Sequence, residues 1–247
     1  MGIGYGIAAR CREAGASVFI ADIDGRAIEG AIQRLAAVES PGSISYAEVD
    51  ISEFDAAHEV TARCVDDLGG VHVLVNNAGI YPISRISDLE PDALDRIMQV
   101  NVHGVVYMTK AFAAQVQRQG TGGSIVNLAS MEAFHPSFAG LSAYAASKGA
   151  VVAMTKHAAL ELSSLRIRVN AIAPGAIVTE GSMNTSAGGG LTEPQRQALA
   201  EAMIAKIPVG RLGAPDDIAT VAVFLASNAS GYVTGQTLLT DGGLLLT

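Results

Sequence analysis

The chain has 247 residues, of which 49% are hydrophobic and 16% are charged, and its formal net charge is −8. This acidic excess argues against a nucleic-acid partner, because phosphate binding needs a basic surface. No apolar run approaches the roughly 18 residues that a membrane span requires, so no membrane partner is expected. The high apolar fraction also excludes disorder. The sequence therefore predicts a soluble globular protein.

The cysteines and histidines show no pattern of a disulfide framework or a metal site. Cys11 and Cys64 are far apart and form no Cys-x-x-Cys pair. We expect reduced, partly buried thiols, and the five scattered histidines predict no metal. The N-terminus lacks the basic and apolar segments of a secretory signal. The expected location is the cytoplasm.

Short β-branched runs alternate along the chain with longer stretches of helical periodicity. The expected strands are residues 17–22, 44–49, 71–75, 124–128, 167–172 and 236–240. The expected helices are residues 25–38, 53–68, 92–118, 142–162, 193–205 and 215–226. This alternation predicts one α/β domain over residues 1–247, with a parallel sheet covered by helices on both faces. The segment 181–205 begins with a glycine-rich stretch, which fits a substrate flap and a plain surface loop equally well.

Glycines open the chain at positions 2, 4 and 6, where a helix is expected to begin. Glycine at such a place lets backbone N–H groups approach a pyrophosphate, whose charge the helix N-terminus favours. Asp22 ends the next strand, about 20 residues on, where a carboxylate accepts from adenosine ribose hydroxyls. Its charge repels a 2′-phosphate, which favours NAD over NADP. Glycines also serve ordinary helix starts, so this pattern alone is weak.

Tyr144 and Lys148 are four residues apart in an expected helix and therefore share one face of it. A cation about 4 Å from a phenol stabilises the phenolate by about 4 kcal/mol at an effective dielectric of 20. This is enough to bring the phenol pKa from about 10 toward 7, although desolvation opposes the shift. Ser130 follows the strand at 124–128 and is placed to donate to a substrate oxygen. A surface Tyr–Lys pair and a capping Ser are the ordinary alternatives.

Together these motifs resemble the short-chain dehydrogenase/reductase family over essentially all 247 residues. The matching positions are Gly2–Gly4, Asn76–Gly79, Asn101–Val102, Ser130, Tyr144–Lys148, Pro174–Gly175 with Thr179, and Asp241–Gly243. The resemblance implies a Rossmann-like, doubly wound fold. It also implies an oxidoreductase that interconverts an alcohol and a ketone or aldehyde with NAD(H). A small-molecule substrate and a homotetramer follow from the same resemblance.

The resemblance assigns roles to individual residues. Tyr144 is the catalytic acid/base, and Lys148 binds the nicotinamide ribose and lowers the pKa of the tyrosine. Ser130 positions the reacting oxygen, and Asn101 supports a water-linked proton relay. The implied cofactor contacts are Gly2, Ile3, Gly4, Asp22, Asp50, Ile51, Asn77, Ala78, Gly79, Tyr144, Lys148, Pro174, Gly175, Ile177 and Thr179. The implied fold supports are Asn170, Gly235 and the turn at 241–243.

The start of the chain departs from the family pattern. The family has a strand, a Thr and an earlier Gly before the glycines that stand here as Gly2 and Gly4. That strand is internal in the family's sheet, so its absence predicts a gap lined by unpaired backbone groups. We expect Met1 to be an internal residue of a longer natural chain, which a native mass of 25.3 kDa would refute. The interval from Ser130 to Tyr144 is also one residue longer than usual, which leaves the shape of the pocket open.

Two other functions stay open on the sequence. An NADPH-dependent 3-oxoacyl reductase shares this framework, although Asp22 argues against it. A non-catalytic dinucleotide-binding protein fits the shortened turn, whereas the intact set of catalytic positions opposes it. The candidate pocket residues are Tyr81, Glu132, His135, Phe138, Glu180 and Met183. Because they mix polar and apolar groups, a sugar, a small secondary alcohol, a steroid-like ring and a hydroxy acid all remain candidates.

Overall fold

The computed structural model describes residues 2–179 and 192–247, and its strands and helices alternate along most of the chain. The strands are β1 (Val18–Asp22), β2 (Ile44–Glu48), β3 (Val73–Asn76), β4 (Gly123–Leu128), β5 (Ile167–Pro174) and β6 (Thr237–Thr240). The helices are α1 (Ile3–Glu13), α2 (Gly25–Ala36), α3 (Phe54–Leu68), α4 (Pro91–Met98), α5 (Gly104–Gln119), α6 (Ser142–Glu161), α8 (Glu193–Ile204) and α9 (Pro215–Ala226). The glycine-rich half of the expected flap lies outside the described residues, and α8 forms most of the remainder.

The strands form two parallel sheets, one of β1 and β2 and one in the order β3-β4-β5-β6. Helices flank both sheets, which confirms the expected α/β class with parallel strands. Within the described residues β1 pairs only with β2, and the edge of β3 away from β4 pairs with no strand. The break between β1 and β3 is an internal gap of the kind that the N-terminal departure predicts. That a longer natural chain fills this gap stays a prediction.

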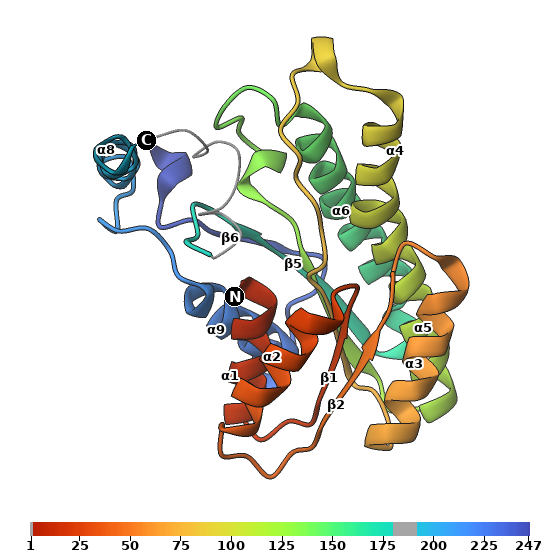
Figure 1. The fold of residues 1–247 in the computed structure, drawn as a ribbon. Coiled ribbons are helices and arrows are strands. Elements are labelled where there is room, and N and C mark those ends of the chain that lie inside the picture. Colours follow the sequence, from red (N-terminus) through yellow and green to blue (C-terminus); the bar gives the residue numbers. More distant parts are fainter. Residues whose placement is uncertain (1, 180–191) are drawn as a thin grey trace.

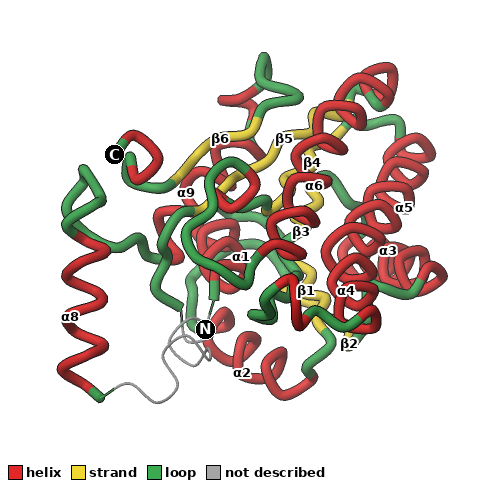
Figure 2. Tube along the Cα trace, turned by 90° about the horizontal axis from the view of Figure 1, so that it is seen from above, coloured by secondary structure: helices red, strands yellow, loops and turns green. Residues whose placement is uncertain are grey.

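Apart from α8, which lies at the periphery, the helices lie in two layers with the strands between them (Figures 1 and 2). Helices α3, α4, α5 and α6 cover one face, and α1, α2 and α9 cover the other. Parallel strands connected by helices place their carboxyl ends along one edge of the sheet. The residues that follow β3, β4, β5 and β6 are therefore neighbours, although they are far apart in sequence.

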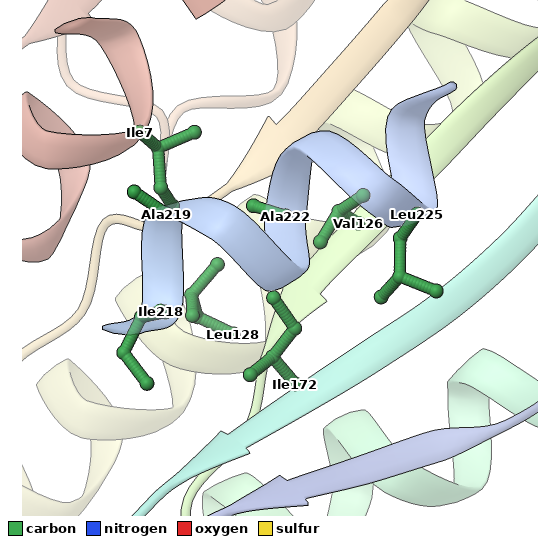
Figure 3. Packing of buried hydrophobic residues seen from close by; sticks show 8 residues of the cluster. All are labelled: Ile7, Val126, Leu128, Ile172, Ile218, Ala219, Ala222 and Leu225. Atoms are coloured by element: carbon green, nitrogen blue, oxygen red, sulfur yellow. The ribbon is translucent and has the colours of Figure 1, made fainter. Parts of the chain in front are cut away.

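A buried apolar cluster fastens α1 and α9 to the larger sheet (Figure 3). Its members are Ile7, Val126, Leu128, Ile172, Ile218, Ala219, Ala222 and Leu225. The two alanines of α9 present small side chains, which allows α1 to approach closely. Each fully buried aliphatic side chain contributes about 1.5–3 kcal/mol to folding. This packing fixes the position of α1 and hence of the glycines at its start.

The long helix expected over residues 92–118 is interrupted, and this part of the prediction is wrong. A five-residue π-helix (Gln99–His103) separates α4 from α5, and the amide of Gly104 donates to the carbonyl of Gln99 five residues earlier. Asn101 lies in this turn with its side chain fully buried. Helical periodicity cannot reveal such a change, because the apolar face continues through it. Turns of this type occur frequently at functional sites.

The residues near the C-terminus that the sequence predicts as fold supports form hydrogen bonds with the backbone around β6. The side-chain amide of Asn170 donates to the carbonyl of Val233 and accepts from the amide of Gln236. The carboxylate of Asp241 accepts from the amides of Gly243 and Leu245 and closes the turn after β6. Gly243 has a φ of 87°, which favours glycine. These contacts hold β6 beside β5.

Candidate functional site

The residues predicted for the site follow the carboxyl ends of strands from both sheets. Asp22 ends β1, and the segment 50–51 follows β2. Residues 77–79 follow β3, Ser130 follows β4, and residues 175–179 follow β5. Tyr144 and Lys148 lie in the first turns of α6. The fold thus gathers at one edge the side chains that the sequence shows only as separated motifs.

The side chain of Ser130 lies close enough to Tyr144 to lower the pKa of the phenol. Ser130 is buried, and its Oγ also accepts from the backbone amide of Glu132 at 3.2 Å. A hydroxyl has one donor and two acceptor positions, so after this contact the Ser130 hydroxyl can still donate to a ligand oxygen beside the phenol. The longer interval between the two residues therefore does not separate them. A short 3₁₀-helix (Met131–Ala133) absorbs part of it.

Burial raises the pKa of the Tyr144 phenol above its ordinary value. The hydrogen bond from Ser130 acts in the opposite direction, while the charge of Glu132 and the neighbouring Tyr81 raise the pKa further. The ring of Tyr81 lies 5.9 Å from the ring of Tyr144. Without a bound ligand, desolvation of the Tyr144 phenol thus raises its pKa more than Ser130 lowers it. The sequence alone does not predict which of these two effects is larger.

Lys148 is 96% shielded from solvent, and its Nζ donates to the backbone carbonyl of Leu128 at 2.7 Å. Its ammonium lies 5.8 Å from the centre of the Tyr144 ring. Desolvation lowers the pKa of Lys148 to about 8, so the group is still mainly charged at pH 7. An ammonium has three donors, and the contact to Leu128 uses one of them. The others are available to a ligand in the neighbouring groove.

Asn101 joins the loop after β3 to the catalytic helix. Its Oδ1 accepts from the amide of Ile80 and its Nδ2 donates to the carbonyl of the same residue, both at 2.8 Å. The same Nδ2 donates to the Oγ of Ser147, which in turn donates to the backbone carbonyl of Tyr144. The sequence analysis missed Ser147. A small hydroxyl residue inside the Tyr-x-x-x-Lys motif is the signal that points to it.

The loop after β3 lies against both Gly4 of α1 and Lys148. A Cβ on Gly4 would lie 2.6 Å from the side-chain nitrogen of Asn77. A Cβ on Gly79 would lie 3.3 Å from Nζ of Lys148 and 3.2 Å from Oδ1 of Asn101. Glycine at both positions therefore allows this loop to approach α1 and Lys148 closely. Ala78 lies between these contacts, half-way along the same loop.

The start of α1 and the segment after β5 line one hollow of about 510 Å³. Gly2 and Thr179 both line it, and Ile3 begins the helix beside them. The amides of the first turn of a helix have no partners within the helix and attract an anion. Tyr144 does not line this hollow, which extends along α1 to Arg10 and Glu13 and reaches Asp216 at the start of α9.

Three further predicted contacts follow β5. The amide of Gly175 donates to the carbonyl of Thr240, and a Cβ there would lie 2.6 Å from the Cα of Asp241. Glycine is thus required by the close approach of the turn after β6. Pro174 ends β5, and Ile177 pairs with Gly213 in a parallel bridge. These residues shape the wall of the groove.

Acidic side chains gather where β1 and β2 end. Asp22 and Glu48 are direct neighbours in the parallel register, so their side chains lie on the same face of the sheet. A Cβ on Gly25 would lie 2.5 Å from a carboxylate oxygen of Glu48, which places that carboxylate beside the start of α2. The sequence analysis missed Glu48, although an acidic residue at the end of the second strand is a visible signal.

Asp50 is held by an arginine that the sequence analysis also missed. Arg96 donates to the carboxylate of Asp50 at 3.0 Å and to the hydroxyl of Ser52 at 2.9 Å. The hydrogen bonds from Ser52 and Arg96 lower the pKa of Asp50 more than its partial burial raises it. Ile51 packs against Gly104, at the start of α5. The loop after β2 is thereby fixed beside the π-helix that carries Asn101.

The residues present fit a dinucleotide and give no sign of a metal centre. The start of α1 offers backbone amides to a pyrophosphate. The carboxylates of Asp22 and Glu48 can accept from ribose hydroxyls, and the buried ammonium of Lys148 has further donors beside the Tyr144 phenol. In the described part of the chain, no three His, Cys, Asp or Glu side chains are grouped to hold a metal ion. Over the same residues, no helix is long and apolar enough to span a bilayer.

Not all of the candidate pocket residues lie at this site. Tyr81 and Glu132 lie close enough to Tyr144 to act on its ionisation. His135 and Phe138 are exposed on the loop that follows Glu132. The other two candidates, Glu180 and Met183, lie outside the described residues.

Comparisons with known proteins agree with this geometry. A family profile described as Enoyl-(Acyl carrier protein) reductase matches residues 1–245. The chain is 36% identical to 3beta-hydroxysteroid dehydrogenase 2 of Eggerthella lenta, over 98% of this chain and 90% of that protein. It is 34% identical to the 3-oxoacyl-[acyl-carrier-protein] reductase FabG of Thermotoga maritima, over 99% of this chain and 94% of that protein.

A solved structure shares the whole fold. The gluconate 5-dehydrogenase of Burkholderia cenocepacia, in complex with NADP and tartrate, superposes with a TM-score of 0.86 and 30% sequence identity. The match covers 100% of this chain and 92% of that one. The profile, the named relatives and the shared fold lead to one conclusion: the chain belongs to the short-chain dehydrogenase/reductase family of oxidoreductases.

Proposed function

We propose that this protein interconverts an alcohol and a ketone or aldehyde with NAD(H), using Tyr144 as the acid/base. The observation that carries the proposal is the buried ammonium of Lys148, which lies 5.8 Å from the centre of the Tyr144 ring, while Ser130 acts on the ionisation of the same phenol. A structural role alone does not require a buried lysine with free donors beside a partly buried phenol. Such perturbed groups gather where proton transfer takes place.

The dinucleotide, when bound, accepts or supplies the hydride. In the oxidative direction the ionised Tyr144 takes the hydroxyl proton of the substrate. Ser130 donates to the same oxygen and stabilises the carbonyl as it forms. In the reductive direction Tyr144 returns the proton. Both groups are fixed by the fold before the substrate arrives, so little reorganisation is needed.

Lys148 and Asn101 support this chemistry in different ways. The positive charge of Lys148 favours the phenolate, and its free N–H donors fit the hydroxyls of the nicotinamide ribose. Asn101 acts as a positioning residue, because its amide is occupied by Ile80 and Ser147. The backbone of the π-helix around Asn101 is where we place the proposed water-linked proton relay.

The proposed cofactor preference is NAD over NADP. Asp22 and Glu48 place two carboxylates at the carboxyl end of the smaller sheet. A carboxylate accepts from ribose hydroxyls, whereas the extra phosphate of NADP would meet repulsion. One relative of solved structure holds NADP, so the preference must be tested on this chain. We assign the remaining predicted contacts to the pyrophosphate, adenine and carboxamide ends of the same groove.

Titration of the purified chain with NADH and NADPH, followed by nicotinamide fluorescence, tests this preference. We expect NADH to bind roughly tenfold more tightly, because the carboxylates are exposed and the repulsion is partly screened. Asp22→Asn should reduce the ratio to about twofold. Asp66→Asn, which removes an exposed carboxylate from α3, is the matched control and should leave the ratio unchanged.

Each other result of the titration has a definite meaning. Tighter binding of NADPH would contradict the role of Asp22 and support the alternative of an NADPH-dependent 3-oxoacyl reductase. Binding of NADH without turnover of any alcohol or carbonyl compound would support a non-catalytic dinucleotide-binding protein. Saturation by neither would show that the 247-residue chain lacks a complete cofactor site.

We further propose a homotetramer in the cytoplasm. Apolar side chains are exposed on the outer helices, among them Leu94 on α4 and Val106 on α5, where they would be covered by another subunit. Cys11 and Cys64 are both unpaired, which fits a reducing compartment. Light scattering after gel filtration should give four times the chain mass of 25.3 kDa.

A further inference from the structure

The loops beside Tyr144 bring a carboxylate and an aromatic ring to the reacting centre. Glu132 is the second residue after Ser130, and its backbone amide donates to the Ser130 hydroxyl. Tyr81 follows β3, and its ring lies 5.9 Å from that of Tyr144. The two loops are joined by a hydrogen bond of 2.9 Å from the amide of Ser84 to the carbonyl of Gly140.

Ser137 fixes the carboxylate of Glu132. One oxygen accepts from the backbone amide of Ser137 at 3.2 Å, and the other accepts from its hydroxyl. An ionised carboxylate has about four acceptor positions, so two are left after these contacts. Only a hydrogen-bond donor can occupy these two remaining acceptor positions of Glu132. Within the described contacts no lysine or arginine bonds to Glu132, and the only ammonium at the phenol, Lys148, is engaged by Leu128.

The charge of Glu132 reaches the reacting centre. Glu132 lies in the short 3₁₀-helix that follows Ser130, its amide contacts the Ser130 hydroxyl at 3.2 Å, and its charge raises the pKa of the Tyr144 phenol. A negatively charged substrate group beside the reacting oxygen would therefore be repelled, whereas a hydroxyl would be accepted. The half-exposed face of Tyr81 offers an apolar platform for the C–H groups of the same substrate.

We infer that the substrate is a neutral compound with several hydroxyl groups, a sugar or polyol. Glu132 accepts from a hydroxyl next to the one that reacts, and Tyr81 packs against its carbon skeleton. This inference rests on the proposed function and names its substrate class. It makes Glu132 and Tyr81 specificity-determining residues, whereas Ser137 is a positioning residue that acts through Glu132.

The test measures kcat/KM with NAD for xylitol, cyclohexanol and 3-hydroxybutyrate. We expect xylitol to be the best substrate and 3-hydroxybutyrate the poorest. Glu132→Gln should lower kcat/KM for xylitol roughly tenfold, mainly through KM, because one charge-assisted hydrogen bond is lost. The same variant should change cyclohexanol oxidation less than twofold. A loop-bracing role alone would lower both equally, so the ratio separates the two roles.

Two further variants keep the test decisive. Ser137→Ala keeps the carboxylate of Glu132 but removes the hydroxyl that holds one of its oxygens. This variant should therefore lower kcat/KM for xylitol by a smaller factor and leave kcat/KM for cyclohexanol unchanged. Glu161→Gln removes an exposed carboxylate at the far end of α6 and should change neither substrate. Loss of NADH binding by Glu132→Gln would indicate that this variant is misfolded. In that case the kcat/KM values of Ser137→Ala for xylitol and cyclohexanol decide between the two roles of Glu132.

The remaining outcomes distinguish this inference from the proposed function. A wild-type preference for cyclohexanol or 3-hydroxybutyrate, or an equal loss on both neutral substrates, would overturn the polyol inference while the dehydrogenase proposal stands. A preference for an amino alcohol over xylitol would show that Glu132 binds an ammonium rather than a hydroxyl. This result would also overturn the polyol inference. Absence of NAD-dependent turnover on every alcohol would overturn both.

Discussion

Replacement of Tyr144 by Phe is expected to lower kcat on the order of 10³-fold while NADH binding changes little. Phe keeps the partly buried ring and its contact with Tyr81 but removes the hydroxyl proposed to exchange a proton with the substrate. General acid–base catalysis by a positioned side chain typically contributes on the order of 10²–10⁴-fold. Steady-state kinetics with the best alcohol of the panel, together with NADH fluorescence titration, measure the two quantities separately.

Tyr232→Phe is the matched control, because the same atom is removed from a side chain that is fully exposed. It should leave kcat unchanged. Retention of most of the turnover by Tyr144→Phe would remove the phenol from the mechanism, and Ser130 would then have to be tested as the group that handles the proton. Loss of NADH binding together with kcat would indicate instead that the hydroxyl is needed to assemble the groove.

Replacement of Lys148 by Met is expected to lower kcat/KM on the order of 10²–10³-fold. Met fills a similar volume but removes the ammonium, which lies 5.8 Å from the centre of the Tyr144 ring and is the donor proposed for the ribose hydroxyls. Removing one preorganised electrostatic group commonly costs this much. Unlike Tyr144→Phe, this variant should also weaken NADH binding, so the two variants differ in a measured quantity besides the rate. Lys156→Met, at an exposed position of the same helix, should change neither.

The buried ammonium also predicts a pH dependence of stability. The pKa of Lys148 is about 8 in the folded chain and 10.5 in the unfolded chain. Between these values the unfolded chain binds more protons, so this residue's contribution to the free energy of unfolding rises with pH. Wild type should therefore gain about 2 kcal/mol relative to Lys148→Met between about pH 7 and pH 9.5.

Urea denaturation of both proteins at the two pH values measures this difference, and other titrating groups cancel because both proteins share them. Lys148→Met should be the more stable protein at the lower pH. A difference between the two proteins that does not change with pH would show that the ammonium is solvated rather than buried.

Much of the fold could be predicted because local patterns decide it. Runs of β-branched residues between helical segments predicted the strands and most helices to within a few residues, including α9 over 215–226. The interruption of the long helix was not predictable in this way. It depends on Asn101, whose amide bonds to the backbone of Ile80, a contact between segments that only the folded chain brings together.

The site shows the same division between local and long-range information. The spacing of Tyr144 and Lys148 on one helix face follows from helical geometry, and the sequence also placed Ser130 at a strand end. The balance of forces on the phenol pKa depends on burial, which spacing does not contain. Here desolvation outweighs the hydrogen bond from Ser130. The contacts of Asp50 with Arg96 likewise join residues 46 positions apart.

By itself, then, the sequence determined the alternation of elements and the family and predicted the catalytic residues, because these depend on residue types at fixed spacings. The tertiary structure decided which of the scattered polar residues face the reacting centre. In the folded chain the backbone amide of Ser137 donates to the carboxylate of Glu132, and the ring of Tyr81 lies beside that of Tyr144. It also decided that the strands divide into two sheets between β1 and β3. Such pairings are long-range, and no local pattern encodes the distance between side chains on different loops.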